Sequence, residues 1–324
     1  MSTAFENPFI DNPDFFDRKI EAMWFSGGGN GAVFHTHGRD GGTEGIWSAQ
    51  GQVRGIWDAP VKTTWQSGAF QEGSTQKAKK VLHRDMELGF HCIETRIPPR
   101  SAEDNESEFR KIFDYEIDPW DDDPEPTTLH IETEKSGERR LDLLLYDAPI
   151  CEPDVDPLEQ QYFNLILKLR AGQPMWYEDN VVTKFKSSAT NASGFIDVEN
   201  PTDQPMRIKW ILTRGTWVLP DFSWRGGKYR RRPGGVHKDR TITTFPVGDA
   251  QGGLVISLDK QDLMVRDVHY TNCLPLMGGQ LFEYVIPPYT PKQQLPISYS
   301  GAPFGGAMAQ LVQPRRWSRP WGLE

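Results

Sequence analysis

The chain has 324 residues and a formal net charge of −9; 37% of its residues are hydrophobic and 25% are charged. This length predicts two domains, because an average domain has about 150 residues. No apolar run reaches the roughly 20 residues that a membrane-spanning helix needs. The acidic balance argues against general nucleic-acid binding, which usually requires a basic surface. The N-terminus has no basic start followed by an apolar stretch, so we expect no signal peptide and synthesis in a cytoplasm.

Glycine, proline and tryptophan are the informative part of the composition. The 30 glycines and 25 prolines divide the chain into short segments, and the 11 tryptophans favour the pleated surface of strands. Cys92, Cys151 and Cys273 are widely spaced and odd in number, which excludes a disulfide framework and a zinc pattern. The composition is typical of a mainly β protein with long loops.

The N-terminal part of the chain predicts strands between glycine-rich turns. Residues 1–24 mix acidic and aromatic side chains, and we expect either one short helix or an arm that orders against a partner. Residues 23–65 hold short apolar pieces between glycines, which predicts strands joined by tight turns and open loops. The clearest strand is predicted at 79–93, where apolar and polar residues alternate. Arg84 interrupts its apolar face, so we expect the first part of this strand at a sheet edge.

A helix is predicted next. Ser101 is a candidate N-cap with Asp104 three residues later, and Phe109, Ile112 and Phe113 form an apolar stripe. The proline- and acid-rich residues 120–126 end this pattern.

A hairpin is predicted over residues 127–147, with its turn at 135–138, and another half-buried strand over 161–170. We expect the core of the first domain to include same-face residues of three strands, namely Leu88, Phe90, Leu143, Leu145, Leu165 and Leu167.

A second β unit is predicted after the polar residues 178–194, which we interpret as a connection between domains. Its first clear strand has Met206, Ile208, Trp210 and Leu212 on one face. Further strands are predicted at 241–245, 254–258, 263–269, 281–286 and 295–299. Residues 301–324 lack periodicity, so we expect no helix or strand there.

Chemical sites are not indicated by the sequence. His35 and His37 would point the same way on a strand and could share a metal, but the sequence supplies no second cluster to complete the three or four ligands of a zinc site. The glycine-rich residues 26–31 lack the spacing of a phosphate loop and its Lys-Ser/Thr. The carboxylates of 116–134 are typical of a solvated loop. We therefore predict no catalytic residue, no metal and no cofactor.

Residues 225–235 form a basic cluster in this acidic chain, with Arg230, Arg231 and Arg232 beside Tyr229 and between glycines. Arginine next to an aromatic ring can bind nucleic acid. The same loop could instead dock on an acidic neighbouring subunit. Of these two interpretations, we favour docking on an acidic neighbouring subunit, because the rest of the chain is acidic.

The C-terminal residues 314–324 predict an extended arm, because Pro314 and Pro320 disfavour a helix. Tryptophan and arginine are enriched at interface hot spots, and the candidate interface residues of this arm are Arg315, Arg316, Trp317 and Trp321. We expect the arm to lie across an adjacent subunit or another protein; packing on its own chain is the alternative.

Several of these stretches resemble a known family. VRGIWDAPVKTTWQSGAFQEGS at 53–74, followed by KVLHRDMELGFHCIE, resembles the N-terminal domain of siphophage distal tail proteins. GFIDVENPTDQPMRIKWILT at 194–213 and LFEYVIPPYTPKQQLPISYSG at 281–301 resemble the second domain of that family. PRRWSRPWGLE at 314–324 resembles the ends of minor tail proteins from phages of mycobacteria and their relatives.

The resemblance implies a mainly β fold with two β-sandwich-like domains, the first with one α-helix. A ring-forming belt domain is expected over residues 1–178, a galectin-like β-sandwich over 179–300, and an extended C-terminal arm over 301–324. The implied protein is a non-enzymatic, hexameric adaptor at the virion tail tip, assembled in the host cytoplasm. It would join the tail tube protein to the tail hub, other minor tail proteins and the receptor-binding apparatus, with no membrane contact and with DNA only as passing cargo.

Two other functions stay open on the sequence. The second domain could bind a cell-wall saccharide through exposed aromatic residues such as Trp217, Phe222, Trp224 and Tyr229. A glycoside hydrolase would need two carboxylates held at a fixed separation, which a sequence does not reveal.

Overall fold

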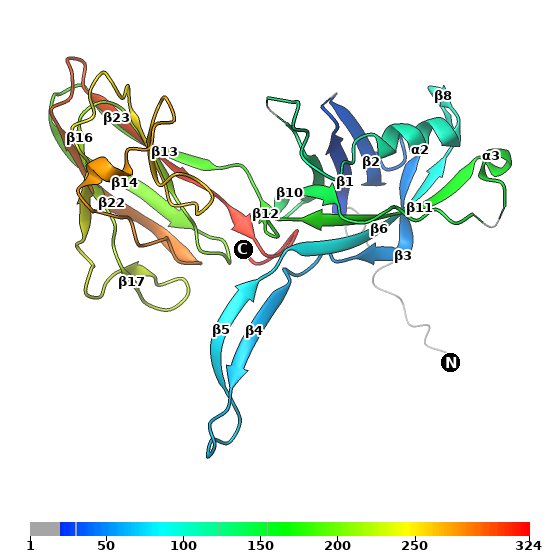
Figure 1. The fold of residues 1–324 in the computed structure, drawn as a ribbon, viewed down its shortest axis with the longest axis horizontal. Coiled ribbons are helices and arrows are strands. Elements are labelled where there is room, and N and C mark those ends of the chain that lie inside the picture. The colour runs from blue at the N-terminus through cyan, green and yellow to red at the C-terminus, as the bar shows by residue number, and fades with distance from the viewer. Residues whose placement is uncertain (1–19, 30, 123, 154) are drawn as a thin grey trace, which may run out of the picture. The chain divides into compact units, whose positions relative to one another are not determined.

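The computed structural model describes residues 20–324 except 30, 123 and 154 (Figure 1). Most of the segment 1–24, for which we expected a short helix or an arm, lies outside the described residues. The described chain is mainly β, as the sequence predicts, and it divides into two compact units. The first unit contains residues 1–177 and 318–322, and the second contains 178–317 and 323–324.

The main sheet of the first unit is antiparallel and runs in the order β2–β1–β9–β10–β11–β6–β3. Its strands are β1 (Ile20–Gly27), β2 (Ala32–Gly38), β3 (Ile46–Arg54), β6 (Arg84–Ile93), β9 (Thr127–Thr133), β10 (Gly137–Leu145) and β11 (Tyr162–Ala171). The short strand β12 (Trp176–Tyr177) pairs with β10. The predicted hairpin 127–147 and the predicted strand 161–170 are therefore confirmed.

The core of the first unit lies between this sheet and helix α2 (Ala102–Arg110). All six predicted core residues are buried, because strand alternation places them on one face. Phe109 of α2 packs edge to face on Phe25 and Phe90 of the sheet, with ring centroids 5.9 and 5.0 Å away. Such aromatic pairs add to the area that they bury.

Helix α2 begins as predicted, since the Ser101 hydroxyl accepts a hydrogen bond from the Asp104 N–H at 3.1 Å. It ends at Arg110, before the apolar stripe does. Ile112 and Phe113 are still buried, because the chain continues in a tight turn with hydrogen bonds three residues back.

Strand β6 pairs with β11 from Arg84 to Ile93 but with β3 only from Glu87 to Cys92, so the ladder at Arg84 is paired on one side, as predicted for the first part of the strand. Arg84 is nevertheless buried, at 1% exposed. Its burial is possible because hydrogen-bond acceptors surround the guanidinium group.

The predicted strand 79–93 is two strands. Its first part belongs to β5 (Thr75–Val81), which pairs with β4 (Val61–Gln66) in a separate two-stranded hairpin. Figure 1 shows this hairpin projecting away from the main sheet of its unit. The remaining short elements of the unit are β7 (Thr95–Arg96), β8 (Pro99–Arg100) and α3 (Pro157–Gln160).

The second unit is a sandwich of two antiparallel sheets. One runs in the order β13–β23–β15–β20–β21 and the other β14–β22–β16–β19. The first sheet consists of β13 (Val181–Ser187), β23 (Ala307–Gln313), β15 (Lys209–Leu212), β20 (Leu254–Ser257) and β21 (Val265–Asp267). The second consists of β14 (Ala192–Asn200), β22 (Thr290–Ser300), β16 (Thr216–Pro220) and β19 (Thr241–Thr243).

Both sheets of the second unit contribute to one core. Trp210 and Leu311 from the first sheet, and Trp217 and Ile297 from the second, belong to the same buried cluster. The remaining short elements are β17 (Trp224–Arg225), β18 (Arg232–Pro233), β24 (Arg316–Trp317) and the 3₁₀ helix η1 (Leu274–Met277).

Three predictions in this unit are wrong. Residues 178–194 are not a mere connection, because they contain β13 and the start of β14. Residues 281–286 form no strand and contribute only an isolated bridge between Ile286 and Met206. Residues 301–324 are not without strands: β23 lies between β13 and β15 and fills an inner position of its sheet.

Candidate functional site

The basic cluster 225–235 is an ordered hairpin loop. Trp224 and Arg225 pair with Pro233 and Arg232, and the loop turns at Tyr229, whose φ is +62°. The Tyr229 N–H donates to the Tyr289 carbonyl at 3.0 Å. Its ring packs on that of Tyr289, with centroids 5.0 Å apart.

The three central arginines of this loop differ in accessibility. Arg230 and Arg232 are exposed. Arg231 is half-buried and donates to the Gly226 carbonyl at 2.9 Å. The loop therefore presents at least two guanidinium groups to a partner.

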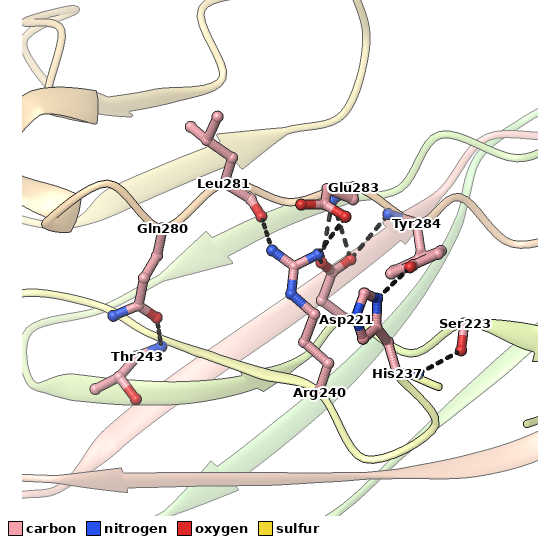
Figure 2. A network of polar contacts seen from close by, with 9 residues as sticks. All are labelled: Asp221, Ser223, His237, Arg240, Thr243, Gln280, Leu281, Glu283 and Tyr284. Atoms are coloured by element: carbon pink, nitrogen blue, oxygen red, sulfur yellow. Dashed lines mark hydrogen bonds and ion pairs between the residues drawn. The ribbon is translucent and has the colours of Figure 1, made fainter. Parts of the chain in front are cut away.

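The loop is held at its base by a buried carboxylate, Asp221 (Figure 2). Asp221 accepts hydrogen bonds at 3.0 Å from the backbone N–H groups of Glu283 and Tyr284. Arg240 lies 2.9 Å from both the Asp221 and the Glu283 carboxylates and donates to the Leu281 carbonyl. Burial raises the pKa of Asp221, and these backbone donors and Arg240 act in the opposite direction.

Further contacts in Figure 2 join the segments that flank the loop to each other and to residues 280–284. The His237 N–H donates to the Ser223 hydroxyl at 3.2 Å, and the His237 ring is hydrogen-bonded to the Tyr284 hydroxyl. The Thr243 N–H donates to the Gln280 side-chain oxygen at 3.1 Å. Contacts within the second unit thus hold the base of the loop in place.

Beside this network lies an open groove of about 720 Å³. Its lining includes Trp224, Arg225, His237, Glu283 and Tyr284. A mixture of aromatic faces with a few charged and hydrogen-bonding groups suits the binding of a ligand.

The saccharide hypothesis loses two of its four aromatic residues. Trp217 is fully buried and Phe222 is 9% exposed, and both lie in the core of the sandwich. Trp224, which is half-buried, and Tyr229, which is exposed, remain accessible. Sequence reasoning failed here because it had no measure of which aromatic residues face the second sheet.

The candidate interface residues of the C-terminal arm contact their own chain. In the second unit, Arg315 is buried and donates to the Glu199 carbonyl at 2.8 Å, and Trp317 is 2% exposed. Arg316 lies 3.7 Å from Asp259. In the first unit, Trp321 packs edge to face on Trp57 at 4.6 Å. A role of these residues and of the arginine loop at an interface stays a prediction.

Two buried arginines that were not predicted as site residues hold residues 318–322 of the first unit. The guanidinium of Arg84 donates to the carbonyls of Ile56, Pro174 and Ser318 at 2.6, 3.0 and 2.9 Å. Burial lowers the pKa of Arg84 to about 10, partly offset by Asp58. Arg139 is 0% exposed and donates to the carbonyls of Arg319 and Gly322.

A serine–histidine–glutamate chain crosses the sheet of the first unit. The His130 ring lies 2.8 Å from the Ser26 hydroxyl and 2.7 Å from the Glu138 carboxylate, and Trp24 stacks on it at 4.8 Å. Burial lowers the pKa of His130, while Glu138 raises it. Hydrolysis would also require oxyanion donors and a substrate cleft, and these contacts supply neither, so we interpret the chain as cross-strand hydrogen bonding.

The two histidines weighed as metal ligands do not belong to a larger set. His35 is paired with Glu44 at 3.0 Å. Within the described residues, no three His, Cys, Asp or Glu side chains gather in a way that could hold a metal ion. Over the same part of the chain, no helix has the length and apolar character required to cross a membrane.

Comparison with known proteins gives two independent likenesses, although no protein-family model matches the chain. The minor tail protein Gp27 of Mycobacterium phage D29 is 27% identical, covering 87% of this chain and 94% of Gp27. Gp27 of Mycobacterium phage L5 is 25% identical with the same coverage.

The second likeness is structural. The Dit protein (gp19.1) of phage SPP1 superposes with a TM-score of 0.52 over 91% of this chain and 98% of Dit, at 10% sequence identity, which shows a shared fold. The resemblance stated from the sequence is thus confirmed: this chain is similar in sequence to the Gp27 minor tail proteins of mycobacteriophages and shares the fold of the SPP1 Dit protein.

Proposed function

We propose that the protein is a ring-forming adaptor at the tip of a long phage tail, joining the tail tube to the hub and the receptor-binding apparatus. The observation that carries this proposal is the pairing of two likenesses over most of the chain, to minor tail proteins in sequence and to SPP1 Dit in fold. The solved Dit protein is described as a paradigm of the hub adsorption apparatus.

The features of the molecule suit a structural role. The exposed Arg230, Arg232 and Tyr229 offer charged and aromatic groups for contacts, and the buried Asp221 and Arg84 make hydrogen bonds within the fold. Its partners would be further copies of itself, the tail tube protein, the hub and other minor tail proteins. The protein would assemble in the host cytoplasm and remain in the virion at the tail tip, with DNA passing through as cargo.

Native mass spectrometry of the purified protein tests the ring. We expect an assembly of six copies of the 36.9 kDa chain. Gold-labelled antibody on intact virions tests the position, and we expect label only at the end of the tail distant from the head. Label along the tube, or a protein that stays monomeric at about 100 µM, would contradict the proposal; at that concentration a ring with ordinary micromolar contacts is assembled.

A saccharide-binding role for the second unit is the second candidate, favoured by the groove beside Trp224 and Tyr284. Binding of the protein to an array of bacterial cell-wall saccharides tests it. We expect Trp224→Ala to abolish any binding, because stacking on an aromatic face would be lost. Tyr270→Ala is the matched control, since Tyr270 is an exposed aromatic residue of the same unit outside the groove.

A further inference from the structure

The side chains of the β4–β5 hairpin of the first unit are exposed along most of its length. Every residue of β4 is exposed, and in β5 only Val81 is partly buried. Among its exposed apolar side chains are Val61, Trp65 and, at the tip, Phe70. A two-stranded ribbon with both faces in water is marginally stable, so a contact that covers it would stabilise it.

The hairpin is also strongly basic. Residues 61–81 contain four lysines and one glutamate. Lys62 lies directly opposite Lys80 in the ladder, and Lys79 lies opposite Thr63. Like charges placed opposite each other destabilise a strand pair. None of these lysines makes an ion pair with a described residue of its own chain, so an acidic partner would relieve the repulsion.

The first unit carries a surface of opposite charge. Residues 114–122 contain five aspartates and glutamates and no lysine or arginine. Between these acids stand the exposed side chains of Tyr115, Ile117 and Trp120. Basic and apolar groups on the hairpin therefore match acidic and apolar groups on this segment.

Hydrogen bonds at the start of the acidic segment and between the residues that flank it hold the segment in place. The Leu145 N–H donates to the Asp114 carbonyl at 2.8 Å, and the Thr127 hydroxyl donates to the Ile112 carbonyl. Within it, the Trp120 N–H donates to the Asp118 carboxylate at 2.9 Å. A partner would thus meet a positioned surface and lose little binding energy to ordering.

We propose that the β4–β5 hairpin of one copy docks on the acidic segment 114–122 of the next copy. This inference rests on the proposed ring and names the two surfaces that build it. Because the two surfaces differ, the contact is head to tail, and repetition of such a contact closes into a ring when the rotation between copies allows it. The apolar side chains would supply burial and the charges would fix register and partner choice.

Charge reversal tests the pair. One variant carries Lys62→Glu, Lys79→Glu and Lys80→Glu, and a second carries Asp114→Lys, Glu116→Lys and Asp122→Lys. We expect each alone to raise the concentration of half-assembly at least tenfold, roughly the cost of juxtaposed like charges. Sedimentation and native mass spectrometry of the wild type and both variants give these concentrations.

Mixing the two variants is the sharper measurement. In an equimolar mixture every contact again joins opposite charges, so assembly should return with the two chains alternating and in even number. A control variant carries Lys184→Glu, Lys186→Glu and Lys260→Glu, all at exposed positions of the second unit. Its net charge changes as much as that of the hairpin variant, and it should assemble like the wild type.

The outcomes separate this inference from the proposed function. If either charge-reversed variant assembles as readily as the wild type, or if the mixture of the two variants fails to assemble, the proposed pair of surfaces is wrong. The proposed ring would not be contradicted by either result. A wild-type protein that stays monomeric at about 100 µM would overturn both.

Discussion

Two basic projections of this molecule are built in opposite ways. The 225–235 loop of the second unit is fastened at its base by the buried Asp221, by Arg240 and by hydrogen bonds to residues 280–284. The β4–β5 hairpin of the first unit is held by the hydrogen bonds between its two strands, and nearly all of its side chains are exposed. The two segments have similar surface charge but differ in how they are supported. Contacts within the second unit hold the base of the loop, whereas the exposed hairpin would gain stability from a partner.

The largest effect should come from removing the anchor of the loop. Asp221→Ala leaves Arg240 and two backbone N–H groups without their carboxylate, and we expect a loss of about 3–5 kcal/mol in the free energy of unfolding. Urea unfolding followed by tryptophan fluorescence measures it. Asp239→Ala, at an exposed position next to the network, should change the free energy by less than about 0.5 kcal/mol. Equal effects of the two substitutions would show that the loop has no special anchor.

The strand that continues from the hairpin should also be sensitive. Leu88 in β6 is 1% exposed, and Leu88→Ala should cost about 2–5 kcal/mol through lost burial and a cavity. Thermal unfolding checks this value. An unchanged midpoint would contradict the register assigned to β6 and the view that the hairpin stands on a rigid base.

Changing the surface of the loop should leave its anchor intact. Replacing Arg230, Arg231 and Arg232 with serine should alter the unfolding free energy by less than about 0.5 kcal/mol and weaken association with an acidic subunit or the hub. Arg39→Ser, Arg100→Ser and Arg207→Ser form a control with the same charge change at exposed sites. Salt-sensitive DNA binding by the wild type that the triple loop variant loses would assign the loop to nucleic acid instead.

Removing the hairpin should have the smallest effect on stability. Replacing residues 62–80 with a short glycine–serine turn should change the unfolding free energy by less than about 0.5 kcal/mol, because almost none of those side chains are buried. Circular dichroism and urea unfolding measure this change. A loss of several kcal/mol would mean that the hairpin supports its own unit, contrary to the comparison drawn above.

Strand alternation was a reliable guide where large apolar residues carry it. Leu165 and Leu167 in β11, and Trp210 in β15, lie in buried cores as their spacing predicts. The N-cap at Ser101 could also be predicted from the sequence. Its hydroxyl accepts a hydrogen bond from the N–H of Asp104, so both partners lie within three residues of each other.

The failures arise where burial does not follow residue type. Strand β23 reads AMAQLVQ: two of its buried residues are small alanines, and the buried Gln313 is satisfied by donating to Thr183 and Asp197. Arg84 is charged yet buried, because carbonyls from distant segments surround its guanidinium. A local sequence pattern does not predict these carbonyl acceptors, because they lie up to 234 residues away from Arg84 along the chain.

Surface function was the least predictable feature. The arginine loop is conspicuous in the sequence, but the Asp221–Arg240 pair that orders it joins residues from separate segments with ordinary local context. The exposed hairpin was not predicted: the sequence indicated one strand over 79–93, and only the fold shows that β5 pairs with β4 and that both strands are exposed.

The way in which the first unit is completed bears on the order of synthesis. Arg84 and Arg139 find acceptors in the carbonyls of Ser318, Arg319 and Gly322, near the end of the chain. Domains usually begin to fold from the N-terminus while translation proceeds, but two buried guanidinium groups of this unit take some of their acceptors from residues 318–322, so part of their hydrogen bonding forms only after those residues have been synthesised. A fragment that ends at residue 317 would lack these three carbonyl acceptors, at a cost of about 1–3 kcal/mol for each donor left unsatisfied. Chains that stop before residue 318 would therefore be less stable, and the fold itself would favour chains that contain residues 318–322 as the material for assembly.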